Sequence, residues 1–275
     1  MPHDMTLTDA AIRVFPDAFL FDGGRYAVAT LLMSAVLLVV HRTWLKARII
    51  QTRRATRSDY IRELWTSLRT VVVYALVFTP VLWLKAHGYG PGNYTGPMNW
   101  AIMTGFVVAL LIAHDAWFYW THRLLHTPRF FRKWHRTHHK TVTPTPFTAY
   151  AFDWREAAVH TGMPVIWQLT IQTPNGAFFI FLGIMIARNV LGHSGTELHP
   201  RGFADHWFWG NFTTTTHHDL HHSGGFGSNY GLYFTWWDRI CGTEHPRYRE
   251  IFREITARGR PVAEPQASIE VPTAA

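Results

Sequence analysis

The sequence is poor in cysteine and in charge. Cys241 is the only cysteine in 275 residues, which excludes a disulfide framework, a zinc site built from thiolates and a cysteine-ligated iron–sulfur cluster. Asp, Glu, Lys and Arg make up 16% of the chain, below the typical value of about a quarter, while apolar residues make up 48%. This balance excludes a disordered or acidic low-complexity protein. The glycine-rich GxGxxG fingerprint of a dinucleotide-binding fold is also missing.

Histidine, by contrast, is present in excess. There are 18 histidines, as many as Asp and Glu combined, and 14 of them fall between His114 and His222. Imidazole is a common ligand of zinc, copper, iron and nickel. A chain that is rich in histidine and aromatic residues but poor in charge therefore makes metal binding the first functional hypothesis.

Apolar residues are bunched into blocks that are typical of membrane helices. The blocks are Tyr26–Val40, Val71–Leu84, Trp100–Ala113, and a pair at Thr161–Gln172 and Gly176–Ala187 that is joined by a Pro-Asn-Gly turn. Tryptophan and tyrosine lie near the block ends, as in the aromatic belts of membrane proteins. The N-terminus lacks the residue order of a signal peptide, so we expect the first block to remain as an anchor.

The charges of the loops predict an orientation in the membrane. The loop between the first two blocks carries seven basic residues from Arg42 to Arg62, whereas His87–Asn99 has no Lys or Arg. By the positive-inside rule, the first of these loops is cytoplasmic and the second lies on the opposite side. The third block then ends in the cytoplasm, the paired blocks enter and leave from there, and every histidine cluster reaches the cytoplasmic face. The basic loop also explains much of the net charge of +8 without nucleic acid.

These patterns predict an all-α, multi-pass integral membrane protein. We expect a helical bundle of about four spans, including a helical hairpin, capped by a cytoplasmic helical region that holds the histidines. Residues 1–110 form the predicted N-terminal membrane anchor, 111–250 the catalytic region and 251–275 a C-terminal tail, all within one structural unit.

Three tight groups of histidines, the first, second and third histidine boxes in chain order, support the metal hypothesis. They are His122-Arg-Leu-Leu-His126, His135-Arg-Thr-His138-His139 and His218-Asp-Leu-His221-His222. Residues at i, i+3 and i+4 share one face of a helix, so each box presents two or three imidazoles in one direction. Eight histidines exceed what one tetrahedral zinc uses and suit two ions with five- or six-fold coordination. Two adjacent metals serve either dioxygen activation or two-metal hydrolysis.

The residues around these boxes resemble the sterol desaturase/fatty acid hydroxylase superfamily. Its first half is matched by Asp115-x-x-x-Tyr119-x-x-His122-Arg123-x-x-His126 and by Trp134-His135-x-x-His138-His139. Its second half is matched by His218-Asp219-x-His221-His222, followed by Asn229-Tyr230-Gly231, Trp237-Asp238-Arg239 and Gly242-Thr243. The similarity covers about Asp115 to Thr243, while the preceding residues match only in general character.

The resemblance implies an integral membrane enzyme with a non-haem di-iron centre, which uses dioxygen and external electrons to hydroxylate or desaturate a lipid. The implied ligands of the two irons are His122, His126, His135, His138, His139, His193, His218, His221 and His222. His217 and His114 are further candidates, either as ligands or as neighbours of the ligands. Asp115 and Asp219 are candidates to hydrogen-bond ligand imidazoles and fix their tautomers, with an arginine as the alternative partner of Asp115. Glu156 either supports the site in the same way or is a solvated charge.

The resemblance also implies partners. The lipid, whether sterol- or hopanoid-like, fatty acyl or related, enters from the surrounding membrane. Electrons come from an external ferredoxin- or cytochrome-type protein with its reductase. Basic residues in Arg42–Arg62 and Arg129–Lys140 are candidate contacts for this donor, with anionic lipid headgroups as the alternative. Two other classes remain open: a membrane two-metal hydrolase, and a non-enzymatic, histidine-rich metal- or haem-binding membrane protein.

Overall fold

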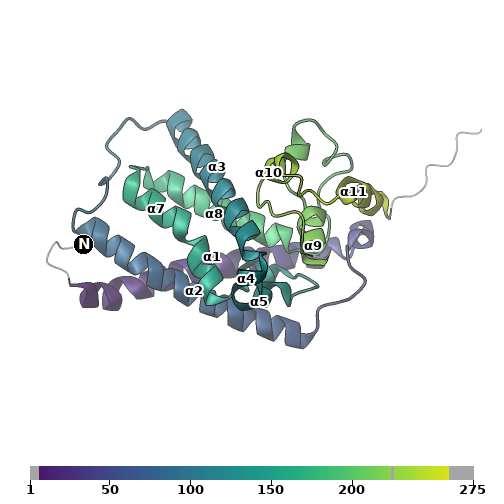
Figure 1. Ribbon diagram of the computed structural model, residues 1–275, viewed down its shortest axis with the longest axis horizontal. Coiled ribbons are helices and arrows are strands. Elements are labelled where there is room, and N and C mark those ends of the chain that lie inside the picture. Colours follow the sequence, from purple (N-terminus) through teal and green to yellow (C-terminus); the bar gives the residue numbers. More distant parts are fainter. Residues whose placement is uncertain (1–5, 224–225, 260–275) are drawn as a thin grey trace, which may run out of the picture.

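A computed structural model describes residues 6–223 and 226–259, and in this part of the chain helices are joined by loops without any extended strand (Figure 1). In chain order the elements are α1 (Leu7–Val40), η1 (Trp44–Arg48), α2 (Arg57–Ala86), α3 (Trp100–Leu125), α4 (Pro128–Phe130), η2 (Phe131–His135), α5 (Arg136–His139), η3 (Pro146–Tyr150), α6 (Trp154–His160), α7 (Gly162–Thr170), α8 (Asn175–Gly192), η4 (Trp209–Asn211), α9 (Thr215–Ser223), α10 (Trp236–Ile240) and α11 (Tyr248–Ala257). The predicted all-α class is confirmed. The predicted tail, 251–275, begins inside α11, and its residues 260–275 lie outside the described residues.

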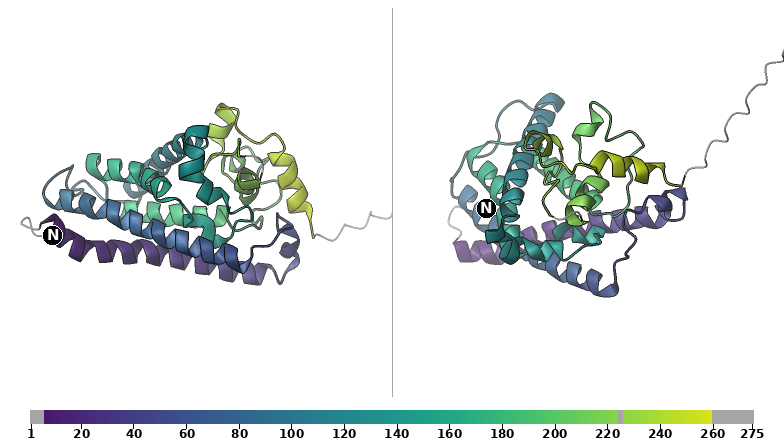
Figure 2. Two further views of the ribbon diagram at one scale, coloured as in Figure 1. Left: turned by 60° about the horizontal axis from the view of Figure 1, so that its bottom comes forward. Right: turned by 45° about the vertical axis from the view of Figure 1, so that its right-hand side comes forward.

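Four helices in the described part of the chain, α1, α2, α3 and α8, are long and apolar enough to cross a membrane. Helix α1 has 34 residues. At 1.5 Å per residue it is about 50 Å long, more than the hydrocarbon core of about 30 Å. It begins well before the predicted apolar block because Thr6 and Asp9 form a capping box at its start. Figure 2 shows α1 and α2 as a long antiparallel pair along one side of the molecule.

The predicted helical hairpin is present, but only one of its arms is long enough to span. Helix α8 has 18 residues, whereas α7 has nine, which corresponds to about 14 Å. Helix α7 follows directly on the short helix α6, which ends at His160, with Thr161 between them. Gly162 lies so close to the Trp117 ring that a side chain there would meet it at 2.3 Å. The helix formed by the apolar block Thr161–Gln172 is therefore too short to cross a membrane by itself.

The histidine-bearing loops gather at one end of the long helices. The end of α3, the end of α8 and the η1 region after α1 come together there, and α9, α10 and α11 complete the cap (Figures 1 and 2). The backbone N–H of Ile50 donates to the carbonyl of Gly195 at 3.0 Å, which ties the first loop to the segment after α8. Segments far apart in the sequence thus meet where the predicted ligands lie.

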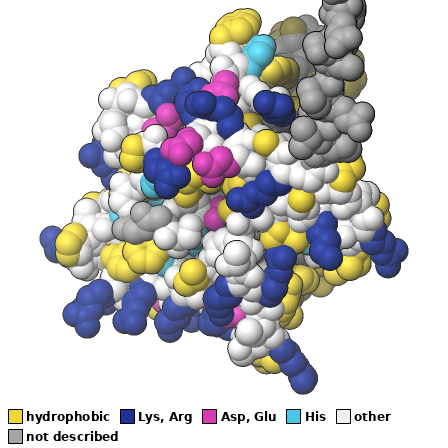
Figure 3. All heavy atoms as spheres, turned by 90° about the vertical axis from the view of Figure 1, so that its right-hand side faces the viewer, with side chains coloured by type: hydrophobic (Ala, Val, Ile, Leu, Met, Phe, Trp, Pro, Cys, Tyr) yellow, Lys and Arg dark blue, Asp and Glu magenta, His cyan; other side chains and the backbone are white. Residues whose placement is uncertain are grey.

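The surface of the bundle differs from the surface of the cap. On α1, Leu31, Leu32 and Leu38 are 61–66% exposed, as expected of side chains that face lipid. Figure 3 looks at the end of the molecule that carries α11 and shows Lys and Arg side chains around its rim, with histidine visible only in small patches. The imidazoles are therefore inside the cap rather than on its surface.

Candidate metal centre

The nine predicted ligand histidines form two groups inside the cap. The five-histidine group consists of His122, His126, His135, His139 and His221, and the four-histidine group consists of His138, His193, His218 and His222. In each group one nitrogen from every ring lies within 4.8 Å of the others. All nine are buried except His126, which is half-buried. The histidines come from four separate stretches of sequence and are brought together only by the fold.

Helix geometry explains how the rings are divided. His122 lies in the last turn of α3, and His126 follows as its C-cap. His135 ends the π-helical turn η2, and the short helix α5 continues from it with His138 and His139. The i, i+4 pair His135/His139 joins the five-histidine group, while His138 at i+3 joins the other. The histidines of the second box, which were predicted to share one helix face, therefore contribute to two neighbouring groups rather than to one.

The third histidine box is also divided between the two groups, but its i, i+4 pair joins the four-histidine group instead of the five-histidine group. In α9, the i, i+4 pair His218/His222 belongs to the four-histidine group, and His221 at i+3 belongs to the five-histidine group. His193, at the C-cap of α8, supplies the remaining member of the four-histidine group.

Backbone carbonyls fix the tautomer of two rings in each group. In the five-histidine group, Nδ1–H of His122 donates to the Tyr230 carbonyl at 2.9 Å and that of His221 to the Ser228 carbonyl at 2.7 Å. In the four-histidine group, His193 and His222 donate to the carbonyls of Asn189 and Thr141 at 2.8 and 3.1 Å. A carbonyl only accepts, so each of these rings carries its proton on Nδ1 and leaves the Nε2 lone pair unprotonated.

These lone pairs are suited to bind a cation. The Nε2 atoms of His221 and His222 are buried and have no hydrogen-bond donor among the described residues. Five Nε2–Nε2 separations between neighbouring rings of a group are 2.9–3.4 Å. A metal–imidazole bond of about 2.1 Å places two ligands at right angles about 3.0 Å apart, so the residues present fit metal ions. Two adjacent ions, one for each group, account for all nine rings.

Burial keeps the imidazoles in the neutral form that binds metal. It lowers the pKa of His135 and His221 to about 3 and that of His193 to about 4. The pKa of His126 is also lowered, by burial and then by the neighbouring histidines. At neutral pH these rings need lose no proton before a metal binds.

Glu156 is a carboxylate that directly supports one ligand. Its side chain is fully buried, and its Oε1 lies 2.7 Å from Nδ1 of His135. Burial raises the pKa of Glu156 to about 7. Of the two roles that the sequence left open, the structure gives Glu156 contact with a predicted ligand rather than exposure to solvent.

The two aspartates predicted to orient imidazoles contact other groups. Asp115 accepts hydrogen bonds from the backbone N–H groups of Tyr233 and Phe234 and from the Trp236 indole, so it anchors the loop before α10. Asp219 accepts from the Gln51 side chain at 3.0 and 3.1 Å. No hydrogen bond joins either aspartate to a ligand histidine, and the alternative arginine partner of Asp115 is not observed within the described residues. For Asp219 the short distance along the sequence to His218 was misleading, because adjacent residues on a helix point to different faces, and Asp115 is two helical turns from His122.

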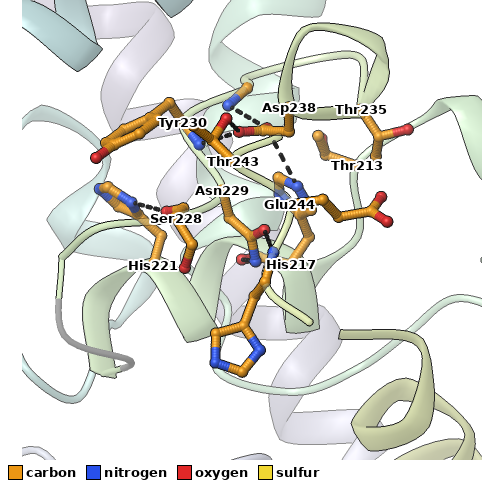
Figure 4. A network of polar contacts seen from close by, with 12 residues as sticks. Thr213, His217, His221, Ser228, Asn229, Tyr230, Thr235, Asp238, Thr243 and Glu244 are labelled. Carbon is orange, nitrogen blue, oxygen red and sulfur yellow. Dashed lines mark hydrogen bonds and ion pairs between the residues drawn. The ribbon is translucent and has the colours of Figure 1, made fainter. Parts of the chain in front are cut away.

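His217 and His114 lie outside both groups. The His217 ring is directed to Asp238, 3.4 Å away, whereas the adjacent His221 ring points toward Ser228 (Figure 4). His114 lies eight residues before His122 on α3, and its Nδ1 is 3.0 Å from the Tyr233 hydroxyl. Neither ring offers a nitrogen to the two groups, so both are neighbours of the centre.

The residues that sequence reasoning missed are backbone acceptors. The loop that carries the Ser228 and Tyr230 carbonyls is held by Asp238, which accepts from the N–H groups of Tyr230 and Gly231, each at 2.9 Å (Figure 4). A side chain at Gly231 would meet the Phe234 carbonyl at 2.4 Å, which explains the glycine. The Asn229-Tyr230-Gly231 and Trp237-Asp238-Arg239 motifs were the available signal, because the first lies in this loop and the second, in α10, carries the Asp238 that holds it.

An apolar cavity of about 30 Å³ adjoins both groups from the side of the bundle. Among its lining residues, the Phe118 ring lies 5.0 Å from the His122 ring, and the Phe152 ring lies 5.0 Å from the His138 ring. A cavity of this size holds about one water molecule. A larger molecule therefore enters only when the lining side chains move aside.

Comparisons with known proteins cover the part of the chain that carries the histidines. The family model for fatty acid hydroxylase matches residues 107–243. A Delta(7)-sterol 5(6)-desaturase of Gibberella zeae is 30% identical over 72% of this chain and 60% of its own length. A methylsterol monooxygenase of Aspergillus fumigatus is 27% identical over 67% and 64%, and lathosterol oxidase of Mus musculus is 29% identical over 66% and 58%. The chain thus spans little more than half the length of these relatives. No solved structure matches it.

Proposed function

Since the histidine-bearing part of this chain belongs to the sterol desaturase/fatty acid hydroxylase superfamily, we propose that the protein is a membrane-bound, di-iron, dioxygen-dependent oxidoreductase that hydroxylates or desaturates a lipid. The observation that carries the proposal is the pair of histidine groups, five and four rings, at the mouth of a membrane helix bundle. Two bound irons would supply the dioxygen-dependent oxidation of an unactivated C–H bond. Each group of rings would hold one of them.

The chain's own residues prepare the site for this chemistry. The carbonyls of Ser228, Tyr230, Thr141 and Asn189 hold protons on Nδ1 and direct Nε2 lone pairs inward. The Phe118 and Phe152 rings line the cavity and lie 5.0 Å from the His122 and His138 rings. A lipid carbon that enters from the bundle would reach the ligands beside these two rings. No acid–base or nucleophilic side chain is required.

The geometry favours this function over the two alternatives. A two-metal hydrolase normally mixes carboxylates among its ligands, whereas both groups in the described part of the chain consist of histidine alone. A haem bound between two histidines needs space for its macrocycle. Here the facing nitrogens are 2.9–3.4 Å apart, which leaves no room for a porphyrin.

The relatives named above act on sterols, and we propose a sterol-like or related lipid as the substrate. Electrons would come from a separate ferredoxin- or cytochrome-type donor with its reductase. The basic rim of the cap is the proposed contact for an acidic donor (Figure 3). It includes exposed residues in and beside the second histidine box, such as Arg132, Lys133 and Lys140.

We place the histidine groups on the cytoplasmic face because the loop before α2 is basic and the loop before α3 has no Lys or Arg. Cysteine labelling in intact cells tests this orientation after replacement of Cys241 by Ser. A Gly92→Cys variant should react with an impermeant maleimide, and a Lys140→Cys variant should react only after permeabilisation. Equal labelling of both without permeabilisation would contradict the orientation.

The direct test of the function is lipidomics of a host with and without the expressed protein. We expect lipids that have gained one oxygen or lost two hydrogens. The matched control is a His138→Ala variant expressed at the same level, which should give none of these products. Accumulation of hydrolysed lipids instead would support the hydrolase, and a haem absorption band in the purified protein would support the haem alternative.

A further inference from the structure

A buried ion pair inside the helix bundle has no part in the metal site. On α1, Nε and one terminal nitrogen of Arg25 lie 2.6 and 2.5 Å from Oδ1 of Asp22, which is only 5% exposed. Another terminal nitrogen of Arg25 donates to the Leu182 carbonyl of α8 at 3.0 Å. Arg25 lies about halfway along α1, in a helix long enough to span the membrane. Ionisable side chains at this depth are costly and usually functional.

This arginine lines the cavity beside the histidine groups, and an unsatisfied hydroxyl lies next to it. Tyr150 also lines the cavity and is 1% exposed, yet its hydroxyl has no hydrogen-bond partner among the described residues. The Arg25 guanidinium carbon is 6.0 Å from the centre of the Tyr150 ring. A guanidinium has five N–H donors, and Asp22 and Leu182 occupy three of them. The lining of the cavity therefore offers two kinds of hydrogen-bond donor, the remaining N–H groups of Arg25 and the hydroxyl of Tyr150.

The lining of the cavity also connects to the metal ligands. Asn189 is one of the lining residues, and its carbonyl holds Nδ1 of His193. Leu182 and Asn189 are seven residues apart on α8, which corresponds to about 10 Å along the helix. The walls between them are mainly apolar, with Leu182, Met185 and Ile186 from α8. A lipid that entered by displacing these side chains would meet donors at Arg25 and Tyr150 and mainly apolar contacts elsewhere in the lining.

We propose that Arg25 and Tyr150 form a polar anchor that donates hydrogen bonds to a neutral oxygen of the lipid, a hydroxyl or a carbonyl. This proposal rests on the proposed function and assigns these two side chains as its specificity-determining residues. The oxygen is neutral because Asp22 already compensates the charge of Arg25, and a carboxylate would add an unpaired charge inside the bundle. Arg25 meets α8 at Leu182, eleven residues and about 16 Å along the helix before His193, so the carbon presented for oxidation lies several bonds away from the anchored oxygen.

A binding experiment tests the anchor without turnover or bound metal. The purified protein in lipid nanodiscs is offered equimolar 5α-cholestan-3β-ol and 5α-cholestane, and separately hexadecan-1-ol and hexadecane. Mass spectrometry then gives the ratio of retained alcohol to retained hydrocarbon. We expect the wild-type protein to favour the alcohol of at least one pair. Tyr150→Phe should reduce that preference about fivefold, since it removes one hydrogen bond to the ligand.

The controls separate recognition from folding. Because the Tyr150 hydroxyl has no partner within the described chain, Tyr150→Phe should not lower the melting temperature. Tyr26→Phe is the matched variant: the Tyr26 ring stacks on Tyr150 at 5.0 Å, and its hydroxyl donates to the Phe147 carbonyl. It should lower the melting temperature and leave the alcohol preference unchanged. Arg25→Lys keeps a charge beside Asp22 but removes the extra donors, and should reduce the preference at least as much as Tyr150→Phe.

Three results would overturn the anchor. They are a wild-type protein that retains neither alcohol over its hydrocarbon, a Tyr150→Phe variant with unchanged preference, and tighter retention of hexadecanoic acid than of hexadecan-1-ol. Each is independent of catalysis. A protein that prefers the alcohol but forms no oxidised lipid would instead refute the proposed function and leave the anchor in place.

Discussion

The two histidine groups lie side by side but are built differently. The five-histidine group takes both rings of the first box, the i, i+4 pair of the second and the single ring of the third. The four-histidine group takes the single ring of the second box, the i, i+4 pair of the third and His193. The second and third boxes thus each link both groups through one short helix. The spacing between the groups is therefore set by helix geometry rather than by flexible loops.

The groups also differ in their support and in their exposure. The five-histidine group has a carboxylate, Glu156, beneath His135, and its member His126 is half-buried. The four-histidine group is fully buried, and its fixed rings His193 and His222 donate to backbone carbonyls. With one ring fewer, the four-histidine group has no ligand to spare. We therefore expect substitutions in the two groups to have unequal effects.

The largest effect is expected from the four-histidine group. His218→Ala and His193→Ala would each leave three rings, so turnover should be abolished and the metal content should fall from two ions per chain to about one. Metal analysis of protein purified anaerobically with iron, together with product analysis, measures both. His245→Ala, outside both groups, should retain two metals and most activity. Two tightly held metals in an active His218→Ala enzyme would show that this ring is not a ligand.

A smaller effect is expected from His126→Ala. Four rings remain in the five-histidine group, so the variant should keep two metals per chain while its turnover falls about 100-fold, near the upper end of losses seen for indirect perturbation of a metal site. The same metal and product analyses apply. If His126→Ala lost a metal as readily as His218→Ala, the two groups would be equivalent and the comparison would fail.

Glu156→Gln should have an intermediate effect that is confined to one group. The amide oxygen still accepts from Nδ1 of His135 but lacks the charge of a carboxylate, so we expect one of the two metals to bind about tenfold more weakly. Competition with a chelator during metal release gives the two affinities separately. Glu250→Gln is the control, because Glu250 is exposed on α11 and pairs only with Arg247 within the described chain. Equal weakening of both metals would contradict a role limited to the five-histidine group.

The smallest effect is expected from Asp219→Asn. Asp219 lies between ligands in the sequence, but its carboxylate accepts from Gln51 and not from an imidazole. Asparagine retains an acceptor for that contact, so turnover should change by no more than about twofold, as for a substitution that disturbs no ligand. Kinetic assay at matched iron content checks this. A loss of turnover of about tenfold or more, as for indirect perturbation of a metal site, would assign Asp219 to the support of the centre.

The sequence predicted the part of the site that depends on local spacing. The three histidine boxes could be placed because i, i+3 and i+4 positions share a helix face, and all of their rings reach the two groups. The apolar blocks likewise located the membrane helices, but α1 begins at Leu7 because a capping box extends it through charged residues. Hydropathy marks the apolar stretch of a helix and not its capped end.

The remaining features depend on contacts between distant segments. Glu156 meets His135 from 21 residues away, and the Tyr230 carbonyl meets His122 from 108 residues away. His217 and His221 have different partners, Asp238 and the Ser228 carbonyl, because α10 and the loop before it pack against different parts of α9. A single sequence contains the residues of these contacts but not the packing that brings them together. For this reason the grouping of the histidines was predictable and most of the contacts that support them were not.

The π-helical turn η2 has an evolutionary consequence. Such a turn is an α-helix that has accommodated one additional residue, usually at a cost in stability. Deleting one residue within Phe131–His135 would restore regular winding and rotate the residues before the deletion by about 100° relative to those after it. His135 would then no longer keep its present register with α3. Selection for a more stable helix and selection for this register therefore act in opposite directions, and a lineage that lost the second would be free to lose the extra residue.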